Sequence, residues 1–408
     1  MRLQRLSLTN FRNFARLTLD FPRPITLLQG DNAQGKTNLL EAIYYLATSR
    51  SPRASTEREV VNWLAFEEPL PFARLEADLA GADFPVKLEI ILTRQANQNN
   101  NVPRFSKQIR INGVARRAFD LVGHLPVVLF LPQDIHLVTG PPAGRRRYLD
   151  ATLCQMDAAY CRTLMDYGRV LVQRNALLRD LRERSSRQGG EQLRFWDEQL
   201  VALGSRLTVR RAALLAALDE EANRQHRALS GGRERLRLRY ISGITDRLPA
   251  VGQQLTLDLE GVVGPPSLDV DQVAVLFQQG LDAMRRRELT AGMSLLGPHR
   301  DDVRFLSEGR DLHAYGSRGQ QRTATLALKL AEVAVMGREL GQPPLLLLDD
   351  IMSELDGARR QALLTLLSSI PQAIVTATDW EDFSPAFRAQ VRQLRVVEGR
   401  IEEVSFLP

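Results

Sequence analysis

The sequence predicts an α/β fold with a mostly helical second lobe inserted into it and no long coiled coil. Apolar runs with strand spacing occupy both ends of the 408-residue chain, and helical spacing fills its middle. A glycine-rich loop of the form G-x-x-x-x-G-K-[ST] lies at Gly30–Thr37. A long coiled coil would need hundreds of heptad residues, and only 280 positions separate Thr37 from Ser317.

Apolar residues in the first 131 positions of the chain predict a series of β-strands. Apolar residues alternate over 6–8 and 17–21, which predicts a β-hairpin leading into a short strand over Ile25–Leu28. We expect further strands over 75–79, 86–92, 109–111 and 127–131. The polar run at 95–101 between them is typical of a hairpin loop.

The middle of the chain changes to helical spacing. Apolar residues recur at three and four over 149–229, with a break at 185–190, which predicts an antiparallel arm of helices ~25 to 35 residues long. A helix over 320–337 and buried strands at 345–348 and 374–378 follow. We therefore expect lobe I over 1–140 and 340–408, and lobe II over 141–339.

The glycine-rich loop is a phosphate-binding site when it joins a strand to a helix, and the strand at Ile25–Leu28 and the helical pattern after Thr37 supply that context. Gly30 and Gly35 let the backbone approach the phosphates, and Lys36 reaches the β- and γ-phosphates. Only four of the 54 basic residues are lysines, so Lys36 is an exception in an arginine-rich chain. The loop residues expected to contact ATP are Gly30, Asp31, Asn32, Ala33, Gln34, Gly35, Lys36, Thr37 and Asn38.

Two adjacent carboxylates follow the apolar run Leu345–Leu348. Asp349 is placed like a Walker B carboxylate that holds Mg2+ through a water molecule, with the Thr37 hydroxyl completing the metal shell. Asp350 is then positioned to orient or deprotonate the attacking water. The alternative is a polar strand exit that caps the next turn.

The segment Ser317-Arg318-Gly319-Gln320 precedes a helix by sequence. A serine in this position is an ordinary N-cap, and taken alone that reading is the more common one. Its place about 30 residues before the Asp349-Asp350 strand makes it similar to the ABC-type signature sequence. There, Ser317 and Gly319, with Gln320, would contact the γ-phosphate bound to a second subunit.

Taken together, these segments resemble the bacterial RecF family of recombination-repair proteins, which are relatives of the SMC and Rad50 head domains. The stretches that carry the resemblance are 10–14, 30–38, 140–150, 297–302, 317–323 and 345–356. The resemblance implies an ABC-type P-loop ATPase head, ATP and Mg2+ as cofactors, a weak DNA-stimulated ATPase, and an ATP-dependent homodimer. It also implies sequence-independent DNA binding near single-strand gaps, and RecR-like and RecO-like mediators that help to load a recombinase. Arg12 would then contact the nucleotide, and Gln133 would act as a catalytic γ-phosphate sensor.

Charge favours a polyanion as partner. Twenty arginines, no lysine and twelve acidic residues lie between Arg145 and Arg239, whereas the whole chain carries only +6. We expect DNA contacts from two clusters, Arg145, Arg146 and Arg147, and Arg285, Arg286 and Arg287. The alternative is that some of these arginines pair with Asp150 or Glu288 and cover helix surfaces.

Other classes fit less well. A small-molecule kinase would not explain the signature-like segment, a transporter ATPase would carry a fuller signature and a switch histidine, and an SMC- or Rad50-like chromosome-structure head would need far more coiled coil. No apolar run reaches the ~18 to 20 residues that cross a membrane, and the N-terminus lacks the apolar region of a signal peptide. We therefore expect a cytoplasmic protein without membrane contacts.

Overall fold

The computed structural model describes residues 2–81, 84–95, 104–184, 190–245, 269–367 and 370–404. The chain divides into two compact units, one formed by Met1–Asp134 with Glu332–Pro408 and the other by Ile135–Ala331. The lobe boundaries expected from the sequence lie a few residues further along the chain. Most of the two expected loops, at 95–101 and 185–190, falls outside the described residues.

The first unit begins with an antiparallel sheet in the order β2-β1-β4-β5-β6-β7. Its strands are β1 (Arg2–Phe11), β2 (Phe14–Asp20), β4 (Phe72–Ala80), β5 (Val86–Gln95), β6 (Arg104–Ile111) and β7 (Val114–Arg116). The hairpin expected at the N-terminus is β1–β2, in which Leu6 pairs with Leu19 and Leu8 with Leu17. Its alternating residues face a core shared with the helix that follows the glycine-rich loop, α1 (Lys36–Thr48).

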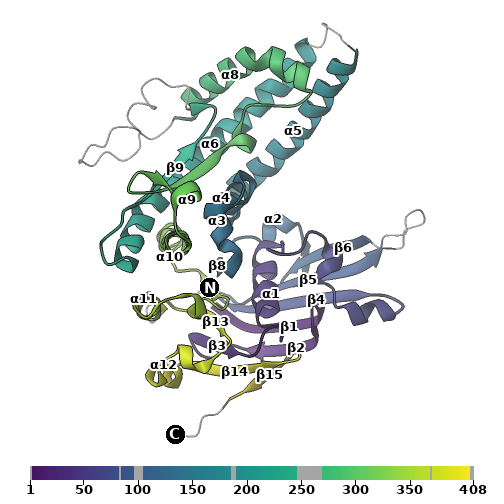
Figure 1. Ribbon diagram of the computed structural model, residues 1–408. Coiled ribbons are helices and arrows are strands. Elements are labelled where there is room, and N and C mark those ends of the chain that lie inside the picture. Colours follow the sequence, from purple (N-terminus) through teal and green to yellow (C-terminus); the bar gives the residue numbers. More distant parts are fainter. Residues whose placement is uncertain are drawn as a thin grey trace. The chain divides into compact units, whose positions relative to one another are not determined.

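A second sheet of the first unit carries the sequence motifs. Its order is β15-β14-β3-β13-β12-β8, and its five strands other than β15 are parallel. The strands are β3 (Ile25–Gln29), β8 (Val127–Phe130), β12 (Leu345–Leu348), β13 (Ala373–Ala377), β14 (Arg392–Val397) and β15 (Arg400–Glu403). The helices α2 (Ala118–Leu121), α11 (Gly357–Leu367) and α12 (Pro385–Gln390) complete this unit (Figure 1). Strands from both ends of the chain therefore lie side by side, with β12 fully buried between β8 and β13.

The second unit is mostly helical, as the apolar spacing predicted. Its helices are α3 (His136–Thr139), α4 (Pro142–Met156), α5 (Ala158–Arg184), α6 (Gly190–Leu229), α8 (Val270–Ala291) and α9 (Leu312–Tyr315). Helix α10 (Arg318–Leu340) begins here and runs into the first unit. A small antiparallel sheet, β11-β10-β9, packs on α6; its strands are β9 (Leu236–Ile241), β10 (Asp302–Ser307) and β11 (Arg310–Asp311).

Two details of the helical arm differ from the prediction. The run that we expected to be continuous from Leu149 is divided at Asp157, whose side chain accepts a hydrogen bond from the Tyr160 N–H and so starts a new helix. Helix α6 has 40 residues, longer than expected, and spans ~60 Å at 1.5 Å per residue. Gly204 lies inside α6 at a point of close packing, where a Cβ would stand 2.6 Å from the Phe277 ring.

Among the described residues, no helix is long and apolar enough to span a membrane.

Candidate nucleotide-binding site

The segments singled out in the first unit meet at one edge of the parallel sheet. The glycine-rich loop follows β3, the Asp349-Asp350 pair follows β12, and β13 lies between these two strands in the sheet. Ligands of open α/β sheets bind outside the carboxyl ends of the strands. The fold therefore brings together groups that lie more than 300 residues apart in sequence.

The backbone of the loop is held open by glycines and braced by Asn13. Gly35 has φ 118°, and a Cβ there would lie 2.5 Å from the Asn13 amide. That amide donates to the Gln34 carbonyl at 2.9 Å and accepts from the Asn38 side chain at 2.8 Å. A Cβ on Gly30 would lie 2.5 Å from the Val396 carbonyl oxygen. Only glycine fits at both positions, as the phosphate-loop reading requires.

Lys36 is buried and folded back onto its own loop. Its ammonium donates to the Gly30 carbonyl and, at 3.1 Å, to the Asp31 carbonyl. Burial lowers the pKa of Lys36, and the nearby carboxylates of Asp350 and Asp349 partly offset that effect. The loop carbonyls hold this charge at the centre of the loop, where the phosphates of a nucleotide would be bound.

Asp349 joins three strands. One carboxylate oxygen accepts a hydrogen bond from the Thr37 hydroxyl at 2.7 Å, and the other accepts one from the Thr376 hydroxyl at 2.8 Å. The carboxylate is only 5% exposed, and its backbone N–H donates to the Phe130 carbonyl of β8. A hydroxyl and a carboxylate at this distance form the all-oxygen donor set that suits Mg2+.

Asp350 differs from Asp349 in its backbone conformation and its hydrogen bonding. It has φ 48°, and its N–H donates to the Thr376 hydroxyl at 3.0 Å. One carboxylate oxygen is buried without a hydrogen-bond partner among the described residues. Burial raises the pKa of Asp350, Lys36 counteracts that rise, and Asp349 adds to it. A carboxylate with one unpaired buried oxygen and a raised pKa has features expected of a general base.

Two further residues were predicted to act on ATP, Gln133 and Arg12. Gln133 is exposed just after β8, in the 3-10 turn Pro132–Ile135, and so follows the strand next to β12. The guanidinium of Arg12 is already bound, donating to both carboxylate oxygens of Glu41 at 3.0 and 2.6 Å and to the Glu59 carbonyl. The roles of Gln133 and Arg12 toward ATP remain predictions.

The signature-like segment lies in the second unit and starts α10. Ser317 accepts from the Gln320 N–H at 3.2 Å, and its own N–H donates to the Gln320 side chain at 3.0 Å. This reciprocal pair is a capping box, so the N-cap reading is correct locally. Ser317 and Gly319 are nevertheless exposed, and a Cβ at Gly319 would meet only the Ser317 hydroxyl, at 3.9 Å. The helix N-terminus is therefore open to an external anion.

The structure corrects the proposed DNA contacts. Arg145 is only 8% exposed and makes a bidentate pair with Asp302 at 2.6 and 3.0 Å, so its assignment to DNA is wrong. Arg285 pairs with the buried Asp197, and Arg146 is half-buried and donates to a backbone carbonyl. The arginines that hydrogen-bond to Asp150 and Glu288 lie outside the two triplets: Arg211 binds Asp150, and Arg174 binds Glu288. Arg147, Arg286 and Arg287 are exposed.

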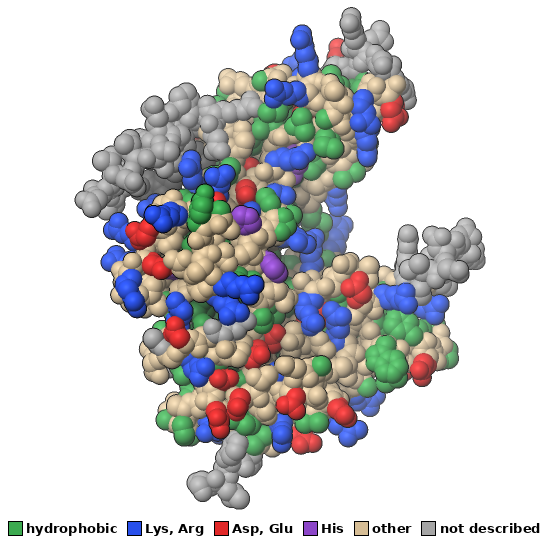
Figure 2. Space-filling view, viewed as in Figure 1, with side chains coloured by type: hydrophobic (Ala, Val, Ile, Leu, Met, Phe, Trp, Pro, Cys, Tyr) green, Lys and Arg blue, Asp and Glu red, His purple; other side chains and the backbone are tan. Residues whose placement is uncertain are grey.

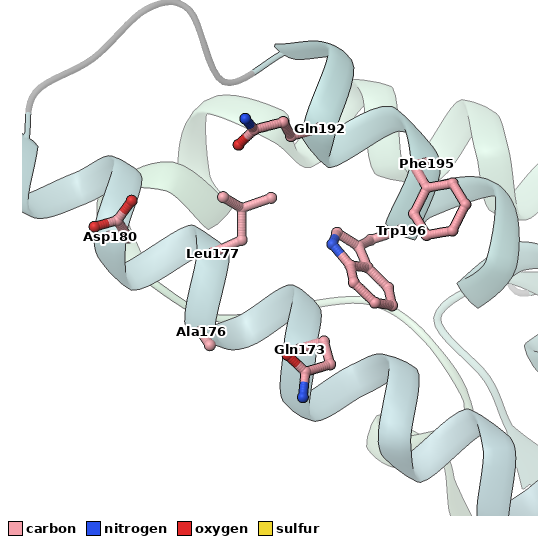
Figure 3. A pocket seen from close by; sticks show the side chains of 7 residues that line it. All are labelled: Gln173, Ala176, Leu177, Asp180, Gln192, Phe195 and Trp196. Carbon is pink, nitrogen blue, oxygen red and sulfur yellow. The ribbon is translucent and has the colours of Figure 1, made fainter.

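A hollow of about 540 Å³ on the helical arm is unrelated to this site. Figure 3 shows it between α5 and α6, lined on one side by Leu177 and on the other by Phe195 and Trp196. The two aromatic rings meet edge to face at 5.1 Å. Trp196 belongs to the apolar spacing that builds the arm, whereas Phe195 is 56% exposed. The residues that line the hollow include one carboxylate, Asp180, and neither a glycine-rich loop nor an acidic pair.

Comparison with known proteins decides the family. A family model described as the RecF/RecN/SMC N terminal domain matches residues 2–401. The DNA replication and repair proteins RecF of Chloroflexus aurantiacus and Herpetosiphon aurantiacus are each 44% identical to this chain, over 98% of it and 99% of their own length. The chain belongs to the RecF family.

Solved structures agree with this assignment. The recombination mediator protein RecF-ATP of the RecFOR pathway matches with a TM-score of 0.81 and 29% identity, covering 99% of this chain and 98% of that one. The Smc head domain from Pyrococcus furiosus matches with a TM-score of 0.52 at 15% identity, which shows the shared fold alone. The fold is thus the ABC-type head of the RecF family, as the motif order predicted.

Sequence reasoning missed the residues of this RecF-family site that hold the others in place. Thr376 was read only as part of a buried strand, yet it connects Asp349 to Asp350. Glu398 and Gly399 of the β14–β15 turn were not singled out either, yet their N–H groups donate to Gln34 of the predicted loop. In the sequence, Thr376 is only one hydroxyl-bearing residue in an apolar strand. Its contacts with Asp349 and Asp350 become visible only when β13 and β12 are placed side by side.

Proposed function

We propose that this protein is an ATP-dependent DNA-binding protein of recombinational repair and replication restart, whose ATPase acts as a dimerisation switch. The observation that carries the proposal is the buried Asp349, bridged to Thr37 of the phosphate loop on one side and to Thr376 on the other. Family membership supports the same reading, since the relatives are DNA replication and repair proteins.

The residues present fit ATP with Mg2+. Thr37 would bind the metal directly and Asp349 through water, and bound Mg2+ would neutralise charge on the β- and γ-phosphates. Lys36 would leave the loop carbonyls for the phosphate oxygens. Asp350 would accept the proton of the attacking water, and Gln133 would lie close to the γ-phosphate from the end of β8.

The exposed N-terminus of α10 supports a second subunit as the partner. Its N–H groups and the Ser317 hydroxyl form an anion site away from the phosphate loop in sequence and in a different compact unit. Two subunits would each offer this segment to the nucleotide bound by the other. Hydrolysis would remove the shared γ-phosphate and dissolve the dimer, and DNA would stimulate this weak ATPase activity.

We propose DNA and mediator proteins as partners because the chain belongs to the RecF family. The protein would bind DNA near single-strand gaps without reading sequence, through exposed arginines such as Arg147, Arg286 and Arg287. It would assist recombinase loading with RecR-like and RecO-like mediators, because a solved relative acts in the RecFOR pathway. We further propose that it works in the cytoplasm. The alternative, an SMC- or Rad50-like chromosome-structure head, is disfavoured because α5 and α6 have only 27 and 40 residues.

The site is tested by Lys36→Ala, with Lys87→Ala as the matched control. Lys87 lies in the same unit on β5, with its side chain 51% exposed and paired to Glu76. Loss of the Lys36 charge should reduce ATP turnover by roughly 100-fold or more, because a contact to the transferring phosphate is lost. The control should keep parental turnover. Equal turnover in the two variants would show that ATP is hydrolysed elsewhere.

A further inference from the structure

Three arginines share the solvent side of the small sheet β11-β10-β9. The other side of this sheet is buried, through Leu236 and Leu238 of β9 and Phe305 of β10. Because side chains alternate along strands, the residues between these apolar positions lie on the opposite side. On that side are Arg237 and Arg239 of β9 and Arg304 of β10, which we call the basic face.

The basic face places like charges against one another. Arg304 and Arg239 are direct cross-strand partners, and Arg237 is diagonal to Arg304. Directly opposed side chains lie ~5 Å apart at Cβ and diagonal ones ~7 to 8 Å, so like charges here destabilise the sheet. A sheet that needed only solubility could carry alternating signs at these positions.

The carboxylates on this side are bound to other groups. Asp302 is held by Arg145, and Asp311 accepts from the His313 N–H at the start of α9. Asp219 of α6 pairs with Arg237 at 3.1 Å across the strand edge, leaving the Arg237 side chain 69% exposed. Within the described residues, Arg239 and Arg304 have no acidic partner, and the Nε of Arg239 is buried without a hydrogen bond.

The face is continuous with the signature-like segment. Strand β11 leads through α9 to Ser317, and Glu234, just before β9, accepts from the Gln320 side chain at 3.1 Å. Figure 2 shows Lys and Arg side chains gathered over the part of the molecule where Figure 1 labels β9, α9 and α10, with single acidic side chains between them. A ligand bound here would contact the same sheet that supports the anion site of α10.

We infer that the basic face of β9 and β10 is a binding surface for the phosphate backbone of duplex DNA. The inference rests on the proposed DNA-binding function and names a surface other than the two arginine triplets. Guanidinium groups bind phosphate bidentately, and a polyanion relieves the repulsion between Arg239 and Arg304. Since the contacts are to phosphates, binding is independent of sequence and depends steeply on salt.

The test is the double variant Arg239→Gln/Arg304→Gln, measured with a labelled mixed-sequence duplex in the presence of ATP across a range of salt. The matched control is Arg169→Gln/Arg194→Gln on the arm, which removes the same charge from side chains that are 72% and 80% exposed. The test variant should lower the slope of log affinity against log salt by about two, one for each phosphate contact. The control should keep the parental slope. Thermal denaturation should show an unchanged or higher Tm for the test variant, because a like-charge pair is removed.

Each other outcome has a definite meaning. If the unaltered chain fails to bind the duplex with ATP, the proposed DNA-binding function fails as well. If it binds and the test variant keeps the parental slope, the DNA function stands and the basic face is not its surface. If the test variant loses binding to polyglutamate while its duplex binding is unchanged, the face is a site for an acidic protein and the inference is overturned.

Discussion

Asp349 and Asp350 are chemically identical neighbours that the fold places in different surroundings. Asp349 accepts two hydroxyl hydrogen bonds and is almost fully buried, so its carboxyl group is held in one position. Asp350 has an under-bonded oxygen and a backbone in the left-handed region. Sequence alone supplied both residue types and their position after a buried strand. It could not supply the difference in bonding, which depends on Thr376 from another strand.

Substitution of Asp349 and substitution of Asp350 should therefore have different effects on ATP binding and turnover. Asp350→Asn should bind ATP and Mg2+ normally but turn over roughly 100-fold more slowly, because an amide cannot take the proton of water. Asp349→Asn should instead weaken Mg2+-dependent nucleotide binding. Titration calorimetry with and without Mg2+, together with turnover measurements, separates the two effects, and reversed phenotypes would exchange the roles assigned here.

The raised pKa of Asp350 also gives a direction for pH dependence. A base is active only when deprotonated, so turnover should fall as pH decreases through the pKa of Asp350, which burial raises above that of a solvated aspartate. The acid limb of the turnover profile should be absent in Asp350→Asn. A profile of unchanged shape in that variant would mean that another group is the base.

At the scale of elements, the start of α10 depends on a residue outside its own motif. Gln320 closes the capping box on Ser317 while its amide nitrogen donates to Glu234. Glu234 thus links the turn before β9 to the signature-like segment. The sequence predicted the strand and helix order around this point because apolar spacing is local. The Glu234 contact joins residues 86 positions apart and had no local signal.

Removal of this contact should loosen the signature segment without affecting the phosphate loop. Glu234→Ala should weaken ATP-dependent self-association several-fold while monomer ATP affinity stays parental, and Glu234→Gln should restore association because it keeps an acceptor oxygen. Glu220→Ala, an exposed acidic residue of α6, is the control. Parental association in Glu234→Ala would show that the capping box alone positions Ser317.

At the scale of the whole molecule, the order of three short segments predicted the ABC-type head and its composite sheet. Buried parallel strands read as apolar runs, and the phosphate loop has a strict spacing, so both are visible in sequence. The DNA contacts predicted from the arginine clusters were less accurate, because the sequence does not show which arginines form ion pairs with carboxylates. Arg145 and Arg147 are two residues apart, yet one is buried against Asp302 and the other is exposed.

The central claim is that ATP joins two subunits through the exposed start of α10. Sedimentation velocity of the unaltered chain, Ser317→Arg and the exposed α8 control Thr290→Arg, each with ATP, ADP or no nucleotide, tests it most directly. We predict an ATP-dependent dimer for the unaltered chain and the control, and a monomer that still binds ATP for Ser317→Arg. An ATP-bound dimer of Ser317→Arg with parental affinity would contradict the account, since Ser317 would then be only a helix cap.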